Sequence, residues 1–228
     1  VHAVGDLTFS IPEGASLAVI GPNGSGKSTL LKVIAGIIEP TSGSVDLHGN
    51  DSAIVLQSTD VDKSVPITVR DTVSMGRFQR LGLLRRFSSE DRAAVDAALE
   101  RLDIADLAAR QIHHLSGGQR QRVFVAQGLA QDEPVLLLDE PLTGLDVVSR
   151  KVIENVLRAE HEAGRTIVTT THNFADAGQA DLVLLLATRF VALGTPDEVF
   201  TEEHLQAAFG GRFARVGDTF VLDDPHHH

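Results

Sequence analysis

A segment near the start of the chain contains the residue types that hold phosphate groups. It separates an apolar run, Leu17 to Ile20, from a helical pattern over Thr29 to Ala35. Glycines let backbone N–H groups wrap an anion, and the start of the following helix adds partial positive charge. The segment therefore predicts a P-loop, in which a strand, a phosphate-binding loop and a helix follow one another. Its residues are Gly21, Pro22, Asn23, Gly24, Ser25, Gly26, Lys27, Ser28 and Thr29.

Two side chains of this loop have predicted roles. The Lys27 ammonium group should reach the β and γ phosphates of a nucleotide, and the Ser28 hydroxyl should ligate magnesium. A glycine-rich turn with an exposed lysine is the simpler alternative, but it does not explain why the strand, the loop and the Lys-Ser pair occur in register. A P-loop alone leaves kinases, GTPases and many ATPases open.

Two carboxylates follow a second apolar run, Val135 to Leu138. A strand end beside a phosphate loop is where α/β sheets present the groups that bind ligands. We expect Asp139 to be the magnesium-side carboxylate, acting directly or through a coordinated water. Glu140 is placed to polarise an attacking water as general base. The alternative, two acids that only end a strand at the surface, loses weight because the same chain has a P-loop.

Four further motifs give the chain a resemblance to the ATPases of the ABC transporter family. Ser116 to Gln119 is similar to that family's signature sequence, and Gln57 follows a strand pattern. Pro141 to Asp146 follow the acid pair, and His172 follows the run Thr166 to Thr171. Taken singly, the signature, Gln57 and His172 would indicate a loop entering a helix, a surface amide and an ordinary histidine. Their common order and spacing cover nearly the whole chain, which makes a chance match negligible.

The resemblance implies that ATP and Mg²⁺ are the cofactors and that two copies of the chain share each ATP. In the family, the γ phosphate lies between the P-loop of one subunit and the signature of a second, in a head-to-tail homodimer. Ser116 and the N–H groups of Gly117 and Gly118, followed by Gln119, would form a second anion-binding helix start. Hydrolysis removes the shared phosphate, and the closed dimer reopens.

Three residues receive roles only from the resemblance. Gln57 would sense magnesium or the lytic water and report to a membrane partner. His172 would hydrogen-bond the γ phosphate and hold Glu140 and the water in line, and Asp146 would cross the dimer interface. The family's adenine-stacking aromatic residue has no visible counterpart, since Phe9 has the pattern of a strand residue and the chain lacks Tyr and Trp.

The elements that position these residues follow from apolar patterning. Buried strands are predicted over Leu17 to Ile20, Val135 to Leu138, Thr166 to Thr170 and Leu182 to Leu186. Together with interleaved helical patterns they predict an α/β fold, a P-loop NTPase core with a parallel sheet flanked by helices. A helix with Val148, Val152, Ile153, Val156 and Leu157 on one face should lie on the sheet and stop at Gly164.

Two smaller parts complete the predicted fold. Asp6 to Ser10 and Ser44 to His48 should form a small antiparallel β subdomain. The middle of the chain lacks strands and contains helix patterns such as Glu90 to Leu102, which predicts a helical insertion. The expected organisation is a single domain over 1–225, with a nucleotide-binding core in 1–58 and 131–195, a helical subdomain with the signature in 59–130, and a C-terminal extension in 196–225.

Composition restricts the function classes. With 228 residues, 43% hydrophobic residues and a mean hydropathy of +0.04, the chain has the composition of an ordinary globular protein. A formal charge of −11 disfavours a nucleic-acid binder, which needs clustered cationic surface. No export signal or spanning segment is visible, which predicts a cytoplasmic chain that reaches the membrane through a protein partner. His226 to His228 resemble the remnant of a purification tag.

Three kinds of ABC protein remain possible: a separate transport ATPase, an ATPase acting on nucleic acid or ribosomes, and a scaffold without turnover. The full set of catalytic residues disfavours the scaffold, and the acidic composition disfavours the second kind. A free-standing subunit resembles importers more than fused exporters. Val65 to Arg77, Ser88 to Arg92 and Asp106 to His114 resemble ATPase subunits of manganese, zinc or iron importers. The partners implied are integral membrane permease subunits and, indirectly, an extracytoplasmic solute-binding protein.

Overall fold

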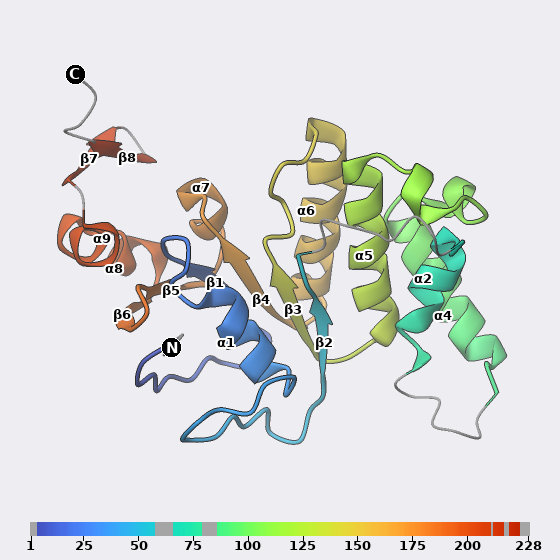
Figure 1. The fold of residues 1–228 in the computed structure, drawn as a ribbon, viewed down its shortest axis with the longest axis horizontal. Coiled ribbons are helices and arrows are strands. Elements are labelled where there is room, and N and C mark those ends of the chain that lie inside the picture. Colours follow the sequence, from blue (N-terminus) through green and yellow to red (C-terminus); the bar gives the residue numbers. More distant parts are fainter. Residues whose placement is uncertain (1–3, 58–65, 79–85, 211, 217–218, 224–228) are drawn as a thin grey trace.

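A six-stranded sheet forms the centre of the protein in a computed structural model, which describes residues 4–57, 66–78, 86–210, 212–216 and 219–223. The strands lie in the order β2-β3-β4-β1-β5-β6 (Figure 1). All neighbours pair in parallel except β5 and β6, so the predicted parallel sheet is mixed, with an antiparallel edge strand. The strands are β1 (Ser16–Ile20), β2 (Ser52–Val55), β3 (Val135–Asp139), β4 (Thr166–Thr171), β5 (Leu182–Leu186) and β6 (Phe190–Gly194).

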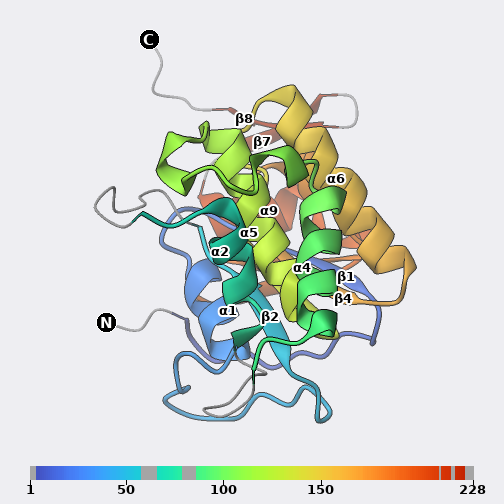
Figure 2. The same ribbon diagram turned by 90° about the vertical axis from the view of Figure 1, so that its right-hand side faces the viewer.

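Helices cover both faces of this sheet, which is why its strands are continuous apolar runs. Alternate residues of β1 show the two layers: Leu17 and Val19 pack in the cluster that contains α1, and Ala18 and Ile20 pack in the cluster below α7, α8 and α9. Figure 2 shows α1 and α6 on opposite sides of the sheet. These helices are α1 (Lys27–Ile34), α6 (Val147–Glu162), α7 (Phe174–Ala177), α8 (Pro196–Val199) and α9 (Glu202–Phe209).

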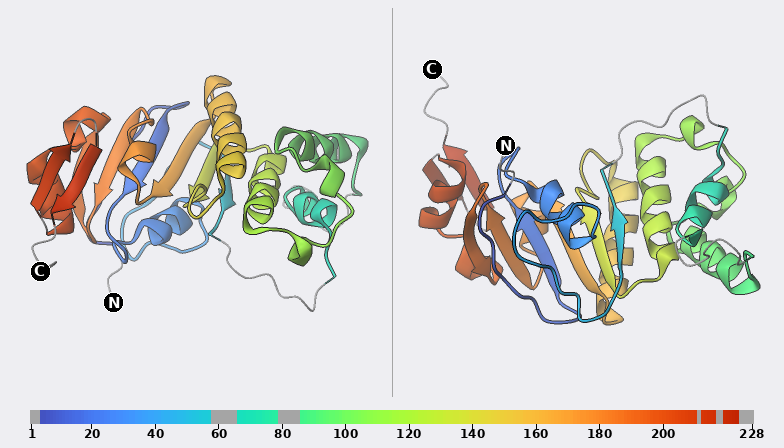
Figure 3. Two further views of the ribbon diagram at one scale, coloured as in Figure 1. Left: turned by 90° about the horizontal axis from the view of Figure 1, so that it is seen from above. Right: turned by 60° about the horizontal axis from the view of Figure 1, so that its bottom comes forward.

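A group of helices beyond β2 forms a separate lobe at one end of the molecule (Figure 3). Its core joins Val73, Leu99 and Val123 with residues of β2 and β3. Capping boxes at Thr68, Ser88 and Ser116 start its three α-helices. We call this group the helical lobe; it consists of α2 (Val69–Met75), α4 (Ser89–Arg101), the 3₁₀ turns η1 (Ala105–Leu107) and η2 (Ile112–His114), and α5 (Gly117–Gln131).

A buried ion pair ties the helical lobe together. Arg77 Nε donates to Asp91 Oδ1 at 3.0 Å, and Arg77 Nη1 donates to the Ala130 carbonyl at 3.0 Å. Asp91 also accepts from the Ser88 amide and hydroxyl at the start of α4. Hydrogen bonds from Ser88, and then the Arg77 guanidinium, lower the pKa of Asp91 from 3.8 to about 2. One arginine therefore links the end of α2 to the start of α4 and the end of α5.

Two predictions about local structure are wrong. Asp6 to Ser10 and Ser44 to His48 form no strands in this structure, so they do not make the predicted small antiparallel β subdomain. Leu7 and Phe9 pack against the core with the expected alternation, but neither segment gains the hydrogen-bonded partner that a strand requires. Val148 is 66% exposed although it shares the apolar stripe of α6; it lies in the first turn, whereas Ile153 and Val156 further along the stripe are buried.

The other predicted elements are confirmed. The four buried strands and the helices at 29–35, 90–102 and 148–157 lie where the sequence predicts them, and Gly164 follows α6 with a left-handed φ of 88°. Near the C-terminus, β7 (Arg212–Val216) and β8 (Thr219–Asp223) pair as an antiparallel hairpin. None of the helices in the described ranges has the length and apolarity needed to cross a membrane. The predicted tag remnant and residues 59–65 lie outside the described residues.

Candidate functional site

The glycine-rich loop connects β1 to α1 and crosses the end of the sheet. A Cβ atom on Gly21 would lie 1.9 Å from the Leu186 carbonyl oxygen of β5, so only glycine fits there. Gly24 and Gly26 have left-handed φ angles of 78° and 96°. Gly26 is the N-cap of α1 and supplies no side-chain acceptor, which keeps the first amides of this helix available for an anion.

The Lys27 side chain folds over the loop. Its Nζ donates to the carbonyls of Gly21 at 2.8 Å and Pro22 at 3.0 Å, and the residue is only 6% exposed. Burial lowers the pKa of Lys27, while the negative charges of Glu140 and Asp139 oppose that shift. The predicted P-loop lysine therefore lies at the mouth of the loop, within the field of both predicted carboxylates.

The acid pair ends β3 as predicted. Asp139 is 4% exposed, and its Oδ1 accepts from the Thr170 hydroxyl of β4 at 2.6 Å. Glu140 has a φ of 49°, in the left-handed region, which costs a residue with a side chain about 1–2 kcal/mol. Its amide donates to Thr170 Oγ1 at 2.9 Å. The backbone thus turns sharply after Asp139. The Asp139 side chain contacts Thr170, whereas the Glu140 side chain contacts Thr143 and Gln57.

Three side chains approach the Glu140 carboxylate, and two of them, Gln57 and His172, were predicted as site residues. Its Oε2 accepts from Thr143 Oγ1 at 3.1 Å and from Gln57 Nε2 at 3.4 Å. His172 Nδ1 lies 3.5 Å from the same oxygen. Gln57 follows β2, Glu140 follows β3 and His172 follows β4, so three adjacent strand ends bring residues together that lie far apart in the sequence.

A cleft of about 530 Å³ joins these side chains to the phosphate loop. Gly21, Pro22 and Asn23 line it on one side, and Gln57, Glu140 and His172 on the other. Phe209, at the end of α9, also lines it. Phe209 was not predicted as a site residue, because no local sequence signal marks the last residue of this helix as part of the cleft.

Ser28 and Thr29 occupy the first turn of α1 and are half-buried, next to the loop. The Ser28 hydroxyl, the Asp139 carboxylate and the Gln57 amide supply oxygen atoms, which are the ligands that Mg²⁺ prefers. Ser25 is buried, and its hydroxyl lacks a hydrogen-bond partner among the described residues. The donor set of the site therefore fits a small hard cation beside a phosphate.

The signature segment forms the start of α5, in the helical lobe. Ser116 Oγ accepts from the Gln119 amide at 3.2 Å, and Gln119 Oε1 accepts from the Ser116 amide at 3.0 Å. Gly117 is exposed at this helix start. None of the residues Ser116 to Gln119 is among the described residues that line the cleft. The structure thus brings the P-loop, Gln57, Glu140 and His172 together but does not add the signature to them.

Asp146 lies at the junction of the signature and the core. It is the N-cap of α6, and its carboxylate accepts from the Ser149 amide and hydroxyl, both at 2.8 Å. These hydrogen bonds lower the pKa of Asp146. A Cβ atom on Gly118 would lie 2.4 Å from both Asp146 Oδ2 and Ser149 Oγ. Asp146 thus supports the signature of its own chain, and its contact with a second copy stays a prediction.

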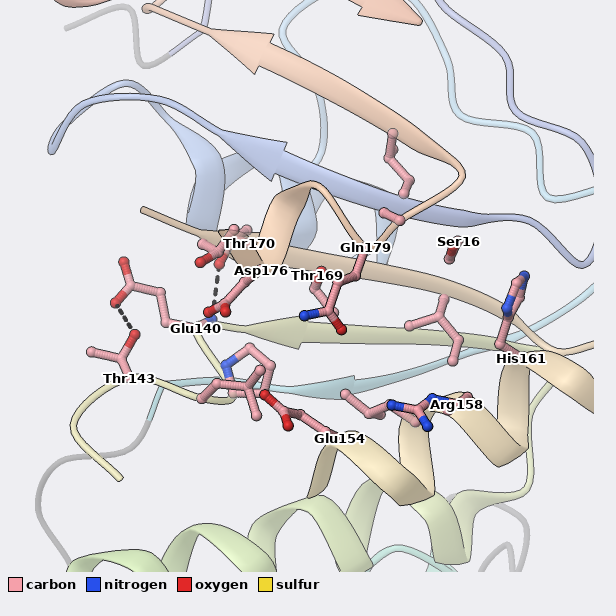
Figure 4. Close-up of a pocket in the computed structure, with 17 residues that line it drawn as sticks. Ser16, Glu140, Thr143, Glu154, Arg158, His161, Thr169, Thr170, Asp176 and Gln179 are labelled. Atoms are coloured by element: carbon pink, nitrogen blue, oxygen red, sulfur yellow. Dashed lines mark hydrogen bonds between the residues drawn. The ribbon is translucent and has the colours of Figure 1, made fainter. Parts of the chain in front are cut away.

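A second cavity, of about 160 Å³, lies behind Glu140 between the sheet, α6 and α7 (Figure 4). Glu140, Thr143 and Thr170 close one end, and Ser16 and His161 line the other. Its polar walls come from α6 and the α7 region and include Glu154, Arg158, Asp176 and Gln179. The glutamate therefore lies between two spaces, the cleft beside the glycine-rich loop and a small polar cavity.

A phosphate-binding loop beside a carboxylate pair and a histidine defines a nucleoside triphosphatase site on a P-loop fold. A family model described as ABC transporter matches residues 4–143. The chelated iron transport system membrane protein YfeB of Yersinia pestis is 40% identical over 234 residues, which cover 97% of this chain and 79% of that protein.

A second relative and a solved structure agree with this family match. The manganese transport system ATP-binding protein MntB of Bacillus subtilis is 39% identical over 226 residues, covering 96% of this chain and 90% of that protein. A solved structure described as an inward-facing conformation of a metal-chelate type ABC transporter has a TM-score of 0.83 and 31% identity, covering 96% of this chain and 88% of that one. The chain belongs to the ABC transporter family, as one of its ATPases.

Proposed function

We propose that this protein binds and hydrolyses ATP to power the import of divalent metal ions through a separate membrane permease. One observation carries the catalytic part: the Glu140 carboxylate lies beside the phosphate loop and within 3.5 Å of both Gln57 and His172. A carboxylate in that place can accept a proton from a water that attacks the terminal phosphate.

In this proposal the first turn of α1 binds the triphosphate. The loop amides and the helix start hold the phosphates, and Lys27 exchanges the carbonyls of Gly21 and Pro22 for phosphate oxygens. Ser28, Asp139 and Gln57 would hold Mg²⁺, which neutralises the charge that develops on the phosphates. Thr143 and His172 orient the Glu140 carboxylate toward the cleft, so that the base is set before the nucleotide arrives.

The position of the signature supports a shared site. Ser116, Gly117 and Gly118 start a helix whose free amides suit a phosphate, yet they lie outside the cleft of their own chain. In a head-to-tail arrangement, the signature of a second copy would reach this cleft, and the signature of the first copy would reach the cleft of the second. We therefore propose a homodimer that closes on two ATP molecules and reopens after hydrolysis.

The relatives support metal ions as the transported substrate, because similarity at about 40% identity to iron and manganese systems extends over nearly the whole chain. The substrate class would include manganese, iron and zinc, and an extracytoplasmic solute-binding protein would deliver the ion to the permease. The chain would act at the cytoplasmic face of the membrane. A different substrate or an exporter is the alternative, and the net charge of −11 disfavours a nucleic-acid partner.

We also propose the division of labour within the domain. Residues 1–58 and 131–195 would bind the nucleotide, and 59–130 would carry the signature and contact the permease through surfaces near Gln57. Residues 196–225 would extend the core. The exposed side chains of Met75, at the end of α2, and of Phe78, three residues later, are consistent with a protein partner at that surface.

Glu140→Gln tests the catalytic part. The amide keeps the shape but cannot accept a proton, so ATP should still bind while kcat falls about 100- to 10,000-fold. ATP binding, dimerisation and phosphate release should be measured in parallel. Glu162→Gln, an exposed position at the end of α6, is the matched control. Normal turnover by Glu140→Gln would exclude Glu140 as the base.

The transport part needs the complete complex. The protein with its permease and solute-binding protein in lipid vesicles should hydrolyse ATP faster when manganese, zinc or iron is supplied on the binding-protein side. Stimulation by none of these ions, together with stimulation by another solute, would assign a different substrate while leaving the ATPase intact.

A further inference from the structure

We propose that Thr170 is a positioning residue for ATP hydrolysis, and that its hydroxyl group sets the relative orientation of the two carboxylates of the site. The proposal rests on the proposed function, because it concerns the residues that hydrolysis would use. Thr170 itself is fully buried, at 0% exposure, and cannot contact the nucleotide. Its role would be exerted through Asp139 and Glu140.

The hydroxyl group of Thr170 makes two hydrogen bonds of opposite sense. It donates its proton to Asp139 Oδ1 at 2.6 Å and accepts from the Glu140 amide at 2.9 Å (Figure 4 shows Thr170 beside Glu140). A hydroxyl group has one proton and two lone pairs, so both bonds can exist together. Each contact restrains a different acid, one by its side chain and the other by its backbone.

The sheet places Thr170 where it can do this. Strands β3 and β4 are parallel neighbours, and Asp139 pairs directly with Thr170 in their register. The Asp139 carboxylate is nearly buried, and a buried carboxylate needs a hydrogen-bond donor. The Thr170 hydroxyl is the donor to Oδ1, and this bond holds the carboxylate in one orientation. The bond does not involve the other carboxylate oxygen, Oδ2.

The bond to the Glu140 amide restrains a strained turn. Glu140 has a φ of 49°, a conformation that residues with a Cβ rarely adopt without support. That conformation turns the chain out of β3 and directs the carboxylate toward Gln57 and Thr143. Without the Thr170 hydroxyl, the amide loses an acceptor and the turn loses a restraint. The base would then occupy its productive position for a smaller fraction of the time.

Three substitutions separate the hydroxyl group from the rest of the side chain. Thr170→Val keeps the volume and the β-branched shape that suit a buried strand but removes the hydroxyl group. Thr170→Ser keeps the hydroxyl group. Thr169→Val makes the same chemical change at the next position, whose side chain lines the second cavity. Thr170→Ala provides a second variant without the hydroxyl group if Thr170→Val does not fold.

Steady-state ATP hydrolysis by the full chain, alone and with its permease, is the first measurement. We expect Thr170→Val to lower kcat roughly 10- to 100-fold with KM for ATP nearly unchanged, because misplacement of a base affects the chemical step. Thr170→Ser should stay within about threefold of the wild type, and Thr169→Val should match it. Wild-type kcat in Thr170→Val, equal losses in Thr170→Ser, or a loss confined to KM would overturn the proposal.

Crystal structures of the wild type and Thr170→Val give an independent measurement that does not need turnover. We expect the Asp139 carboxylate to rotate or the Glu140 backbone to leave its left-handed conformation. Unchanged positions of both acids would refute the role of Thr170 even if activity fell. Absence of turnover in the wild type and Thr169→Val alike would instead contradict the proposed ATPase function, and the crystal structures would still decide the role of Thr170.

Discussion

Two helix starts in this protein are suited to bind phosphate, and they are built differently. The start of α1 has Gly26 as its N-cap, in a left-handed conformation and with no side-chain cap among the described residues. The start of α5 has Ser116, whose hydroxyl group accepts from the Gln119 amide, while the Gln119 side chain accepts from the Ser116 amide. The first helix start leaves its amides to a ligand, and the second satisfies part of its own.

This difference indicates the order in which the two would act. A helix start without internal acceptors, next to a buried lysine and at the mouth of a cleft, can bind a triphosphate by itself. The start of α5, which its own side chains cap, is stable without a ligand and has fewer free amides to offer to a phosphate. We therefore infer that ATP binds first to the P-loop and that the signature of a second copy joins later.

Lys27→Ala should weaken phosphate binding at the first of these helix starts. It removes the ammonium group that would bond to the phosphates, so ATP affinity should fall about 10- to 100-fold. Isothermal titration with Mg-ATP measures the change. Lys32→Ala, in the last turn of the same helix, is the matched control. If the affinity of Lys27→Ala stayed at the wild-type value, the P-loop would not be the primary phosphate site.

Ser116→Arg should separate the second helix start from the first. A large cation at this exposed position blocks the approach of another subunit, so the ATPase rate should fall about 100-fold while one chain still binds ATP. Ser116→Thr keeps the capping hydroxyl group and should retain activity. ATP titration measures binding by Ser116→Arg. Sedimentation with ATP, after Ser116→Arg is combined with Glu140→Gln, measures whether the dimer still forms. Full activity of Ser116→Arg would contradict a site shared between two copies.

Asp91→Asn should have the smallest effect, on the lobe that carries the second helix start. Because the folded-state pKa of Asp91 is about 2, below its ordinary 3.8, its charged form stabilises the fold. That contribution is present above about pH 4 and is lost as the pH falls toward about 2. The stability difference between wild type and variant in urea unfolding should therefore shrink over this range.

Asp96→Asn is the control for that experiment, because Asp96 lies on α4, as Asp91 does, but forms an exposed ion pair with Arg70 of α2. Exposed pairs contribute little, so its stability should follow the wild type at each pH. ATP binding to the P-loop should be unchanged in Asp91→Asn, since neither member of the Arg77–Asp91 pair lines the cleft. A constant difference between wild type and Asp91→Asn down to pH 2 would exclude the Arg77–Asp91 pair as its source.

Much of the fold could be predicted from the sequence because its strands are buried on both faces. Continuous apolar runs such as Leu182 to Leu186 leave few alternatives, and the nine residues of the P-loop motif lie directly between a strand and the helix that they begin. The antiparallel pairing predicted for Asp6 to Ser10 does not occur in the structure. Alternation shows which face of a segment is apolar, but it does not identify a partner strand.

The finer features of the site depend on contacts between distant residues. The contact of Thr170 with Asp139 follows from the register of β3 and β4, which local patterns do not contain. The left-handed conformation of Glu140 also has no sequence signal, because left-handed turns usually indicate glycine or asparagine. Phe209 reaches the cleft only through the packing of α9 beside the sheet. The motifs thus predicted most residues of the candidate site, and the fold determines the contacts between them.

The tight contact at Gly118 has a consequence for cooperativity. The backbone of this signature glycine rests on Asp146 and Ser149 at the start of α6, with no room for even a methyl group between them. Only residues 141–145 separate Glu140 from Asp146. In a head-to-tail pair, Glu140 would serve its own chain's nucleotide while Gly118 serves the neighbour's. We therefore expect the two ATP molecules of such a pair to communicate, so that the loss of one phosphate alters how firmly the other is held.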